Sequence, residues 1–355
     1  MLREEARCCH GVLKMGDSPR TIAGLQTGNN RPDGNRVFRQ GEVMNATDAH
    51  AVLRGPMIPV ITNLKDDGSL DLAAIRGNVR CVVERGIVEG QGVLLAAGAG
   101  GDFPMLTLDE RKQVVETIVE ASDGRTPVLA GAQDTNVDSV IEMAQWSESV
   151  GAYGVQMSSG YYYQSSAEDC LRVFQAVHEA TSSARIMIYN TYWEGYNMSL
   201  EDVERVAELP RCVSLKWSTS EGSGVYLRGV ARFAEQLAVV DNQGLHVMNH
   251  MLGGTGYITH LATVWPEHDL EVWRLLEAGK YPAAQEKITH ANWLWSDFRG
   301  KMWRRTGGES AVIKAALELC GRPGGPTRLP TRALDDAERS ELRELLIRIG
   351  VPDVK

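Results

Sequence analysis

Short apolar runs recur along the chain about every thirty residues, and amphipathic stretches lie between them. Within these stretches apolar side chains are three, four or seven positions apart, as at Leu72, Ile75 and Val79, which is the spacing of a helix that covers a sheet. The short runs are typical of buried strands. The pattern predicts eight strands: 57–62, 92–97, 127–131, 154–157, 185–189, 212–216, 237–240 and 256–259.

Helix starts are marked by Ser or Thr placed three positions before an acidic residue. This pattern occurs at Thr107, Thr135, Ser165 and Ser199, each after one of the predicted strands. Repeated strand, loop and capped helix predict βα units, whose right-handed crossovers produce a parallel sheet. Eight units favour the α/β class and a closed (β/α)8 barrel. An open, doubly wound sheet is the alternative, but the G-x-G-x-x-G motif is missing after the first strand.

We expect the barrel to occupy residues 51–265. Residues 1–50 are rich in Arg, Gly, Asn and Asp and show no periodicity, which predicts a loose or disordered arm, with Met44 as an alternative translation start. Further amphipathic stretches predict a helical extension, residues 266–355, that packs on the barrel. These stretches are 269–278, 281–302, 310–320 and 335–349.

The composition narrows the class of ligand. The net charge is −9 and the isoelectric point about 5.5, whereas a nucleic-acid surface needs clustered positive charge, so we expect a small molecule. No apolar stretch approaches the roughly 18 residues of a membrane span, and the N-terminus lacks a signal-peptide pattern. A soluble, cytoplasmic protein is expected. The six cysteines include no C-x-x-C pair, so neither a disulfide framework nor a thiolate zinc site is indicated.

Lys216 ends the apolar run 212–216 and is the first candidate for chemistry. A desolvated amine loses its proton more readily than a free lysine does, and an unprotonated amine can attack a carbonyl carbon to form a Schiff base. The alternative is a structural lysine whose stem packs in the core while its ammonium pairs with a carboxylate. We favour imine chemistry.

Tyr189 ends the preceding strand, and the active sites of (β/α)8 barrels lie at the carboxyl ends of the strands. We expect its hydroxyl beside the Lys216 amine, where it could transfer protons, while a tyrosine bonded to backbone is the alternative. A glycine-rich loop after the second strand lets backbone N–H groups approach a carboxylate, although it could be a simple tight turn. This loop consists of Gly98, Ala99, Gly100 and Gly101.

Two other groups of residues are weaker candidates. Tyr161, Tyr162 and Tyr163 follow the fourth predicted strand, and loop tyrosines serve interfaces as often as catalysis. His246 and His250 are four positions apart and could present two imidazoles to a metal on one helix face. Because there is no H-E-x-x-H motif, ordinary polar or packing roles are favoured and no metal site is predicted.

Together these residues resemble the family of dihydrodipicolinate synthase and N-acetylneuraminate lyase. Members of that family are Schiff-base-forming, class I aldolase-type (β/α)8 barrels. The resemblance extends from about Gly55 to the C-terminal helices. It rests on residues 55–62, residues 98–111, Tyr189-Asn190-Thr191, Leu215-Lys216 and residues 253–256.

The resemblance implies roles for single residues. Lys216 would be the Schiff-base lysine, and Tyr189 the tyrosine that relays protons at the imine carbon. Tyr161 or Tyr162 would match a tyrosine that, in this family, can reach into the site of a neighbouring subunit. We assign Tyr162 to catalysis and Tyr161 to substrate binding. Family members are commonly tetramers built from tight dimers, so a homo-oligomer, a dimer of dimers, is expected.

Two departures from the family pattern concern the substrate. Family members usually carry two hydroxyl residues in a G-[TS]-[TS]-G-E loop, where this chain has Ala99 and Gly100, with Asp102 for the glutamate. The arginine with which the synthase grips the carboxylate of its aldehyde substrate is matched here by Glu194. Because a carboxylate at that position would repel such a substrate, we do not expect true dihydrodipicolinate synthase activity.

The sequence therefore predicts a lyase that joins Lys216 to a pyruvate-like 2-oxo acid and cleaves or forms its C3–C4 bond. A 2-keto-3-deoxy sugar-acid dehydratase that uses the same imine is one alternative, and a catalytically silent ligand-binding barrel is another. Neither a metal nor an organic cofactor is expected. The loop 98–101 would hold the substrate carboxylate. The remaining substrate-binding candidates are Tyr192, Trp193, Glu194 and Ser218 at the variable end of the substrate, and Gly254 and Tyr257 near the eighth strand.

Overall fold

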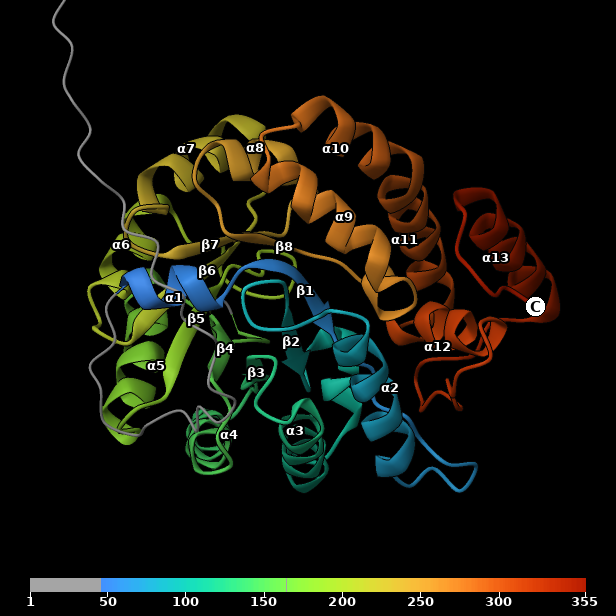
Figure 1. Ribbon diagram of the computed structural model, residues 1–355. Helices are drawn as coiled ribbons and strands as arrows, with labels where there is room; N and C mark the ends of the chain where they lie inside the picture. The colour runs from blue at the N-terminus through green and yellow to red at the C-terminus, as the bar shows by residue number, and fades with distance from the viewer. Residues whose placement is uncertain (1–45, 164) are drawn as a thin grey trace, which may run out of the picture. The chain divides into compact units, whose positions relative to one another are not determined.

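Eight parallel strands close into a barrel in sequence order, with β1 paired to both β2 and β8 (Figure 1). The computed structural model describes residues 46–163 and 165–355. It confirms the (β/α)8 fold and all eight strands, and the largest difference is that β1 ends at Pro59 and not at residue 62. The strands are β1 (Gly55–Pro59), β2 (Val93–Ala96), β3 (Val128–Gly131), β4 (Gly154–Ser158), β5 (Arg185–Tyr189), β6 (Cys212–Trp217), β7 (Ala238–Asp241) and β8 (Gly256–Ile258).

A helix follows each strand and covers the outside of the barrel (Figure 1). The apolar face of each helix packs on outward strand residues, as Val114 and Ile118 do in one continuous outer core with Leu94. This is why the helical spacing of apolar residues was readable in the sequence. The helices are α2 (Leu72–Glu84), α3 (Leu108–Ser122), α4 (Val137–Ser149), α5 (Ala167–Ala180), α6 (Leu200–Ala207), α7 (Ser223–Phe233), α8 (His246–Met251) and α9 (Pro266–Glu277).

A second, smaller core fills the inside of the barrel and includes Met57, Leu95 and Met187. Ala49 of α1 (Ala46–Val52) belongs to this inner core. Because α1 comes just before β1, it covers the end at which the strands begin, and the carboxyl ends of the strands remain for the active site. The prediction of a loose arm is therefore wrong for residues 46–50, which are helical, whereas residues 1–45, with Met44, lie outside the described part.

The predicted helix starts are right at two places and displaced by one residue at two others. Thr107 and Ser199 cap α3 and α6, each with a reciprocal capping box. The cap of α4 is Asn136 and not Thr135, because the Asn136 side chain accepts the backbone N–H of Asp138. Similarly, Ser166 and not Ser165 caps α5, with Asp169 as its capping-box partner.

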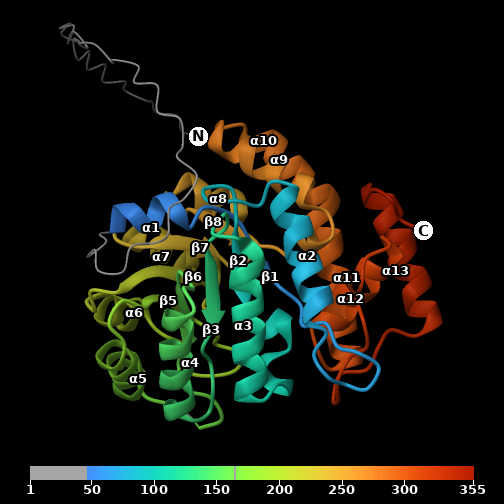
Figure 2. The same cartoon turned by 60° about the horizontal axis from the view of Figure 1, so that its bottom comes forward.

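The C-terminal extension is helical, as predicted, and lies on the side of the barrel that carries α9 and α2 (Figures 1 and 2). Its elements are α10 (Tyr281–Lys287), a π-helical segment (Ile288–Trp293), α11 (Leu294–Thr306), α12 (Ser310–Leu319) and α13 (Asp336–Ile349). Val272 and Leu276 of α9 pack with Tyr257 of β8, so we count α9 as the eighth barrel helix and begin the extension at α10, not at residue 266.

Ion pairs join the extension to the first turn of α3 and to the loop after β2, both at the carboxyl ends of the strands. Arg328 forms a two-pronged pair with Glu110 at 2.8 and 2.9 Å. The Lys314 ammonium of α12 lies 3.6 Å from the carboxylate of Asp102, directly after the glycine-rich loop. The extension thus contacts the end of the barrel where catalysis is expected.

None of the helices within the described ranges has the length and apolar character to cross a membrane.

Candidate active site

Lys216 projects into the barrel from β6. Its neighbours Leu215 and Trp217 belong to the outer core, and side chains alternate along a strand, so the Lys216 side chain faces the inside. The residue is only 6% exposed. Tyr189 of β5 is its partner in the sheet, and the Lys216 Nζ lies 3.7 Å from the centre of the Tyr189 ring. The two residues predicted to carry the chemistry are therefore in contact.

Burial lowers the pKa of Lys216 from the ordinary 10.5 to about 8, because removal from water disfavours the charged amine. The carboxylates of Glu309 and Glu194 oppose this shift. At pH 7 about one amine in ten is then unprotonated, compared with roughly three in ten thousand at the ordinary pKa. The barrel interior thus increases the fraction of Lys216 that carries an unprotonated amine near neutral pH.

Tyr189 is protonated throughout the neutral range. Burial, and then the nearby carboxylates of Glu309 and Glu194, raises its pKa well above the ordinary 10. A hydrogen bond with Asn242, the residue after β7, opposes the shift without cancelling it. A neutral phenol beside an amine can both donate and accept a proton, so the hydroxyl suits a relay.

The glycine-rich loop after β2 forms a single 3₁₀ turn at Ala99–Gly101. The Gly101 N–H donates to the Gly98 carbonyl at 2.9 Å, and the Thr62 hydroxyl donates to the Gly101 carbonyl at 2.7 Å. The N–H groups of Ala99 and Gly100 occupy the first positions of the turn, where no acceptor exists within it. The loop is therefore held by its neighbours and has two backbone donors to offer a carboxylate.

Three residues that were not predicted join the site: His260, Arg299 and Glu309. The Glu309 Oε2 lies 3.3 Å from both the His260 Nε2 and the Arg299 Nη2. Burial works against the charge of Glu309, but the hydrogen bond with His260 and the charge of Arg299 lower its pKa to about 2. Burial and the charge of Arg299 lower the pKa of His260 to about 4. At neutral pH the carboxylate is charged and the imidazole neutral.

The sequence held a signal for only one of these three residues. His260 is two positions after Ile258, which packs against the inner core, so strand alternation would have directed His260 into the barrel mouth. Glu309 and Arg299 lie in the extension, far along the chain from Lys216, and nothing local to them indicates the contact.

A cavity of about 340 Å³ opens among the loops that follow β2 to β5. Its lining includes Phe103, Arg111, Asp134, Tyr161 and Glu194. Glu194 as a whole residue is exposed at the rim of the cavity. Its carboxyl group is nevertheless partly shielded from water, and this burial, followed by the charge of Glu309, raises the pKa of Glu194. Since Arg111 is paired with Asp134 at 3.0 Å, the charge left over in this cavity is that of Glu194.

The other predicted aromatic residues divide between the site and the surface. Tyr192 packs against Trp193, with ring centres 4.9 Å apart, and the Trp193 ring lies 6.0 Å from that of Tyr189. Tyr162 is 86% exposed, has a left-handed φ of 73°, and contacts the ring of Tyr163. The structure thus places Tyr192 near the site and Tyr162 on the surface of its own chain.

Three predicted substrate-binding residues are placed differently. The Ser218 hydroxyl is near the mouth but donates to the Asn190 carbonyl at 3.0 Å. Gly254 precedes β8, against the Asn249 side chain, and so lies at the end of the barrel opposite to the active site. Tyr257 alternates outward and its hydroxyl donates to Asp269. Neither Gly254 nor Tyr257 joins the Lys216 group, because one is at the wrong end of β8 and the other on its wrong face.

His246 and His250 each have a carboxylate partner of their own. The His246 Nδ1 pairs with Asp241, and the His250 Nε2 lies 3.0 Å from Glu277. In the described ranges, 46–163 and 165–355, no three His, Cys, Asp or Glu side chains are grouped to hold a metal ion.

Comparisons with known proteins agree with the fold and identify the family. Residues 52–349 match the model of the dihydrodipicolinate synthetase family. A 4-hydroxy-tetrahydrodipicolinate synthase from Afipia carboxidovorans is 31% identical over 311 residues, which cover 85% of this chain and 99% of the relative. An uncharacterized DapA-like lyase from Halobacterium salinarum is 27% identical over 84% of this chain and 95% of its own.

Solved structures show the same fold. YagE from Escherichia coli K12, described as a prophage protein of the dihydrodipicolinic acid synthase family and solved in complex with pyruvate, aligns with a TM-score of 0.74. The alignment covers 84% of this chain and 99% of that one, at 23% sequence identity.

Proposed function

The chain belongs to the dihydrodipicolinate synthetase family, and from that premise we propose that it is a lyase that forms a Schiff base between Lys216 and a 2-oxo acid. The observation that carries the proposal is the position of Lys216, buried, largely desolvated and against Tyr189 at the carboxyl end of the strands. A relative described as a lyase and a related fold solved with pyruvate support this assignment.

Imine formation begins when the neutral amine of Lys216 adds to the ketone carbon of the acid. In the adduct the nitrogen passes one proton to the former ketone oxygen, which gives a neutral carbinolamine. Its hydroxyl then gains a second proton and leaves as water, while the nitrogen keeps its remaining proton and its lone pair forms the double bond. A protonated carbon–nitrogen double bond remains. Tyr189 is the group that we assign to these transfers, because its phenol is protonated and its ring contacts the amine.

The protonated imine then accepts electrons from the C3–C4 bond. The hydroxyl on C4 loses its proton, the bond breaks to release an aldehyde, and C3 becomes the terminal carbon of an enamine. Protonation of C3 and hydrolysis of the imine release the shorter acid, and the reverse order gives condensation. We propose that the Ala99 and Gly100 N–H groups hold the carboxylate of the acid throughout.

The second substrate should carry no carboxylate at the end that faces the cavity. Glu194 and Glu309 both act on Lys216 as negative charges. The positive charge of Arg111 is already neutralised by Asp134. A carboxylate entering here would meet repulsion without a free cation, which argues against dihydrodipicolinate synthase activity. Hydroxyl groups or an amine would instead find acceptors in Glu194 and Tyr161.

We further propose that the protein is a homo-oligomer in which Tyr162 serves a neighbouring subunit. Its ring is 86% exposed although its backbone is held in a left-handed conformation, which a non-glycine residue adopts at a cost. Light scattering of the purified protein would test this directly, and a monomer would exclude a role for Tyr162 in a partner's site.

The lyase proposal can be tested by trapping the imine. The protein is mixed with pyruvate, longer 2-oxo acids or 2-keto-3-deoxy sugar acids and reduced with borohydride. The mass of the intact protein is then measured by mass spectrometry. We expect the mass gain of a reduced imine with at least one acid. Product analysis without reductant separates an aldehyde plus a shorter acid, which means cleavage, from a dehydrated acid. Failure to take up any of these acids would contradict the lyase and favour a silent ligand-binding barrel.

A further inference from the structure

The start of α12 brings a carboxylate to the mouth of the barrel. Glu309 directly precedes α12, and Lys314 on the same helix lies 3.6 Å from Asp102 at the end of the glycine-rich loop. We propose that Glu309 is the counter-ion of the Lys216 imine, so that the C-terminal extension contributes to the active site and does not merely cover the barrel. This inference rests on the proposed function, because it assigns a role within the same imine chemistry.

The contacts of His260 place Glu309 at the reacting end of the barrel. His260 faces inward after β8, as Lys216 does on β6, and its Nε2 lies 3.3 Å from Glu309. A Cβ atom at position 100 would lie 3.2 Å from this same nitrogen. The Pro59 side chain is nearer still, at 2.7 Å, so the space beside Gly100 is filled by this proline and by the imidazole that contacts Glu309.

Several charged or titratable groups act on Lys216 or contact it, and two of them are carboxylates. They are Glu309 before α12, Glu194 after β5, His260 after β8, Tyr189 of β5 and, through Glu309 and His260, Arg299 of α11. Glu309 acts on Lys216 more strongly than Glu194 does. Arg299 and His260 keep Glu309 ionised, whereas burial raises the pKa of Glu194.

A fixed carboxylate favours the charged forms of the lysine nitrogen, namely the ammonium and the iminium. The iminium is the electron sink of the reaction, so stabilising it while the carbon–carbon bond breaks lowers the barrier. With a pKa of about 2, Glu309 is too weak a base to take a proton from the amine. It therefore acts through its charge, and proton transfer is left to Tyr189. Arg299 is a positioning residue, since it holds Glu309 at 3.3 Å.

The pH at which Lys216 reacts measures this charge without requiring turnover. Wild-type protein and variants are labelled with limiting acetic anhydride between about pH 6 and about pH 10, and acetylation of the Lys216 peptide is quantified by mass spectrometry. Because Glu309 raises the pKa of Lys216, Glu309→Gln should lower the pH of half-maximal labelling by about one unit.

Glu341→Gln is the matched control. Glu341 is also a carboxylate of the extension, but it pairs with Lys301 at the surface, and its loss should leave the labelling of Lys216 unchanged. An unchanged pH for Glu309→Gln, or an equal shift for Glu341→Gln, would overturn the assignment.

Turnover gives a second readout. Loss of the counter-ion should lower kcat by about ten- to a hundredfold with a smaller change in KM, and Glu309→Asp should recover part of it. If Glu309→Gln does not fold because Arg299 is left buried alone, the double variant Glu309→Gln/Arg299→Gln removes both charges and should shift in the same direction. A wild-type protein that forms no imine overturns both proposals, whereas an imine with unshifted variants overturns the counter-ion alone.

Discussion

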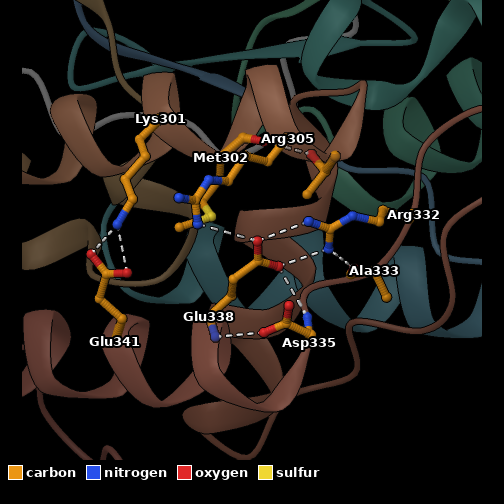
Figure 3. Close-up of polar contacts among 9 residues, drawn as sticks. Lys301, Met302, Arg305, Arg332, Ala333, Asp335, Glu338 and Glu341 are labelled. Atoms are coloured by element: carbon orange, nitrogen blue, oxygen red, sulfur yellow. Dashed lines mark hydrogen bonds and ion pairs between the residues drawn. The ribbon is translucent and has the colours of Figure 1, made fainter.

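Glu309 and Glu338 are two carboxylates of the C-terminal part of the chain that share a pKa of about 2 and an arginine partner, but differ in the other groups that surround them. Glu338 of α13 accepts two hydrogen bonds from Arg332, at 2.7 and 2.8 Å, and lies 3.7 Å from Arg305 (Figure 3). It also accepts the backbone N–H of Asp335 and so completes the capping box of α13. Glu338 itself is buried, but both arginines are exposed, so this cluster joins α13 to the preceding segment at the surface of the extension.

The Glu309 cluster has the opposite character. Its carboxylate is held by one arginine and a neutral histidine within the barrel mouth, and it faces Lys216, whose pKa is shifted toward neutrality. A lowered carboxylate pKa therefore does not identify an active site by itself. The informative feature is a second group, perturbed in the sense that catalysis needs, at the same place. A substitution in one cluster should leave the other cluster intact.

The largest effect is expected for Lys216→Met. Turnover should fall by at least about a thousandfold, because the variant lacks the amine that forms the imine beside Tyr189. The same substitution also removes a buried amine, so the melting temperature should not fall. Lys301→Met is the control, since Lys301 pairs with the exposed Glu341 at the surface, and it should retain full turnover. If Lys216→Met kept more than about a thousandth of the wild-type turnover, a residue other than Lys216 would carry the chemistry.

Tyr189→Phe should lower turnover by about a hundredfold while borohydride still traps the imine. The ring that packs on Lys216 is kept and only the hydroxyl is lost, so binding of the acid should change little. Rates of turnover and of trapping are compared on the same preparation. Equal turnover in both proteins would show that Tyr189 only packs against the lysine.

Glu338→Gln should affect stability alone. The variant loses the ion pairs with Arg332 and Arg305 and weakens one side of the capping box, which should lower the melting temperature by about 2–4 °C. The value of kcat and its pH profile should stay unchanged. Calorimetry and kinetics on the folded variant measure the two effects. A change in the pH profile would mean that the Glu338 and Glu309 clusters are coupled.

The smallest effect concerns acid stability. Both carboxylates have a folded-state pKa of about 2 and an ordinary value of 4.5, so the folded form binds fewer protons than the unfolded form between these values. Their stabilisation is present above about pH 4.5 and is lost as the pH falls toward 2. Urea unfolding across this window should show a shallower loss for Glu338→Gln than for wild type, and parallel curves would contradict the pairing.

Much of the fold could be predicted because its determinants are local. Eight apolar runs with helical spacing between them are enough to specify a (β/α)8 barrel, and Thr107 and Ser199 cap helices as their patterns indicate. The caps at Asn136 and Ser166 were displaced by one residue because adjacent side chains compete for the same role. Local sequence cannot rank two neighbouring acceptors that both suit a helix start.

The site was predictable only where strand ends determine it. Lys216 and Tyr189 follow from buried strands that end on polar residues, but Gly254 and Tyr257 were placed by nearness to β8, without regard to its direction or its two faces. Glu309 could not be found from the sequence, because its contact with His260 depends on how the extension folds back over the barrel.

The central claim is that Lys216 is the nucleophile, and peptide mapping after borohydride trapping with pyruvate or another accepted 2-oxo acid tests it most directly. The account predicts one reduced adduct per chain, on the peptide that contains Lys216 and on no other lysine. An adduct on another lysine, or none with any 2-oxo acid, would contradict it.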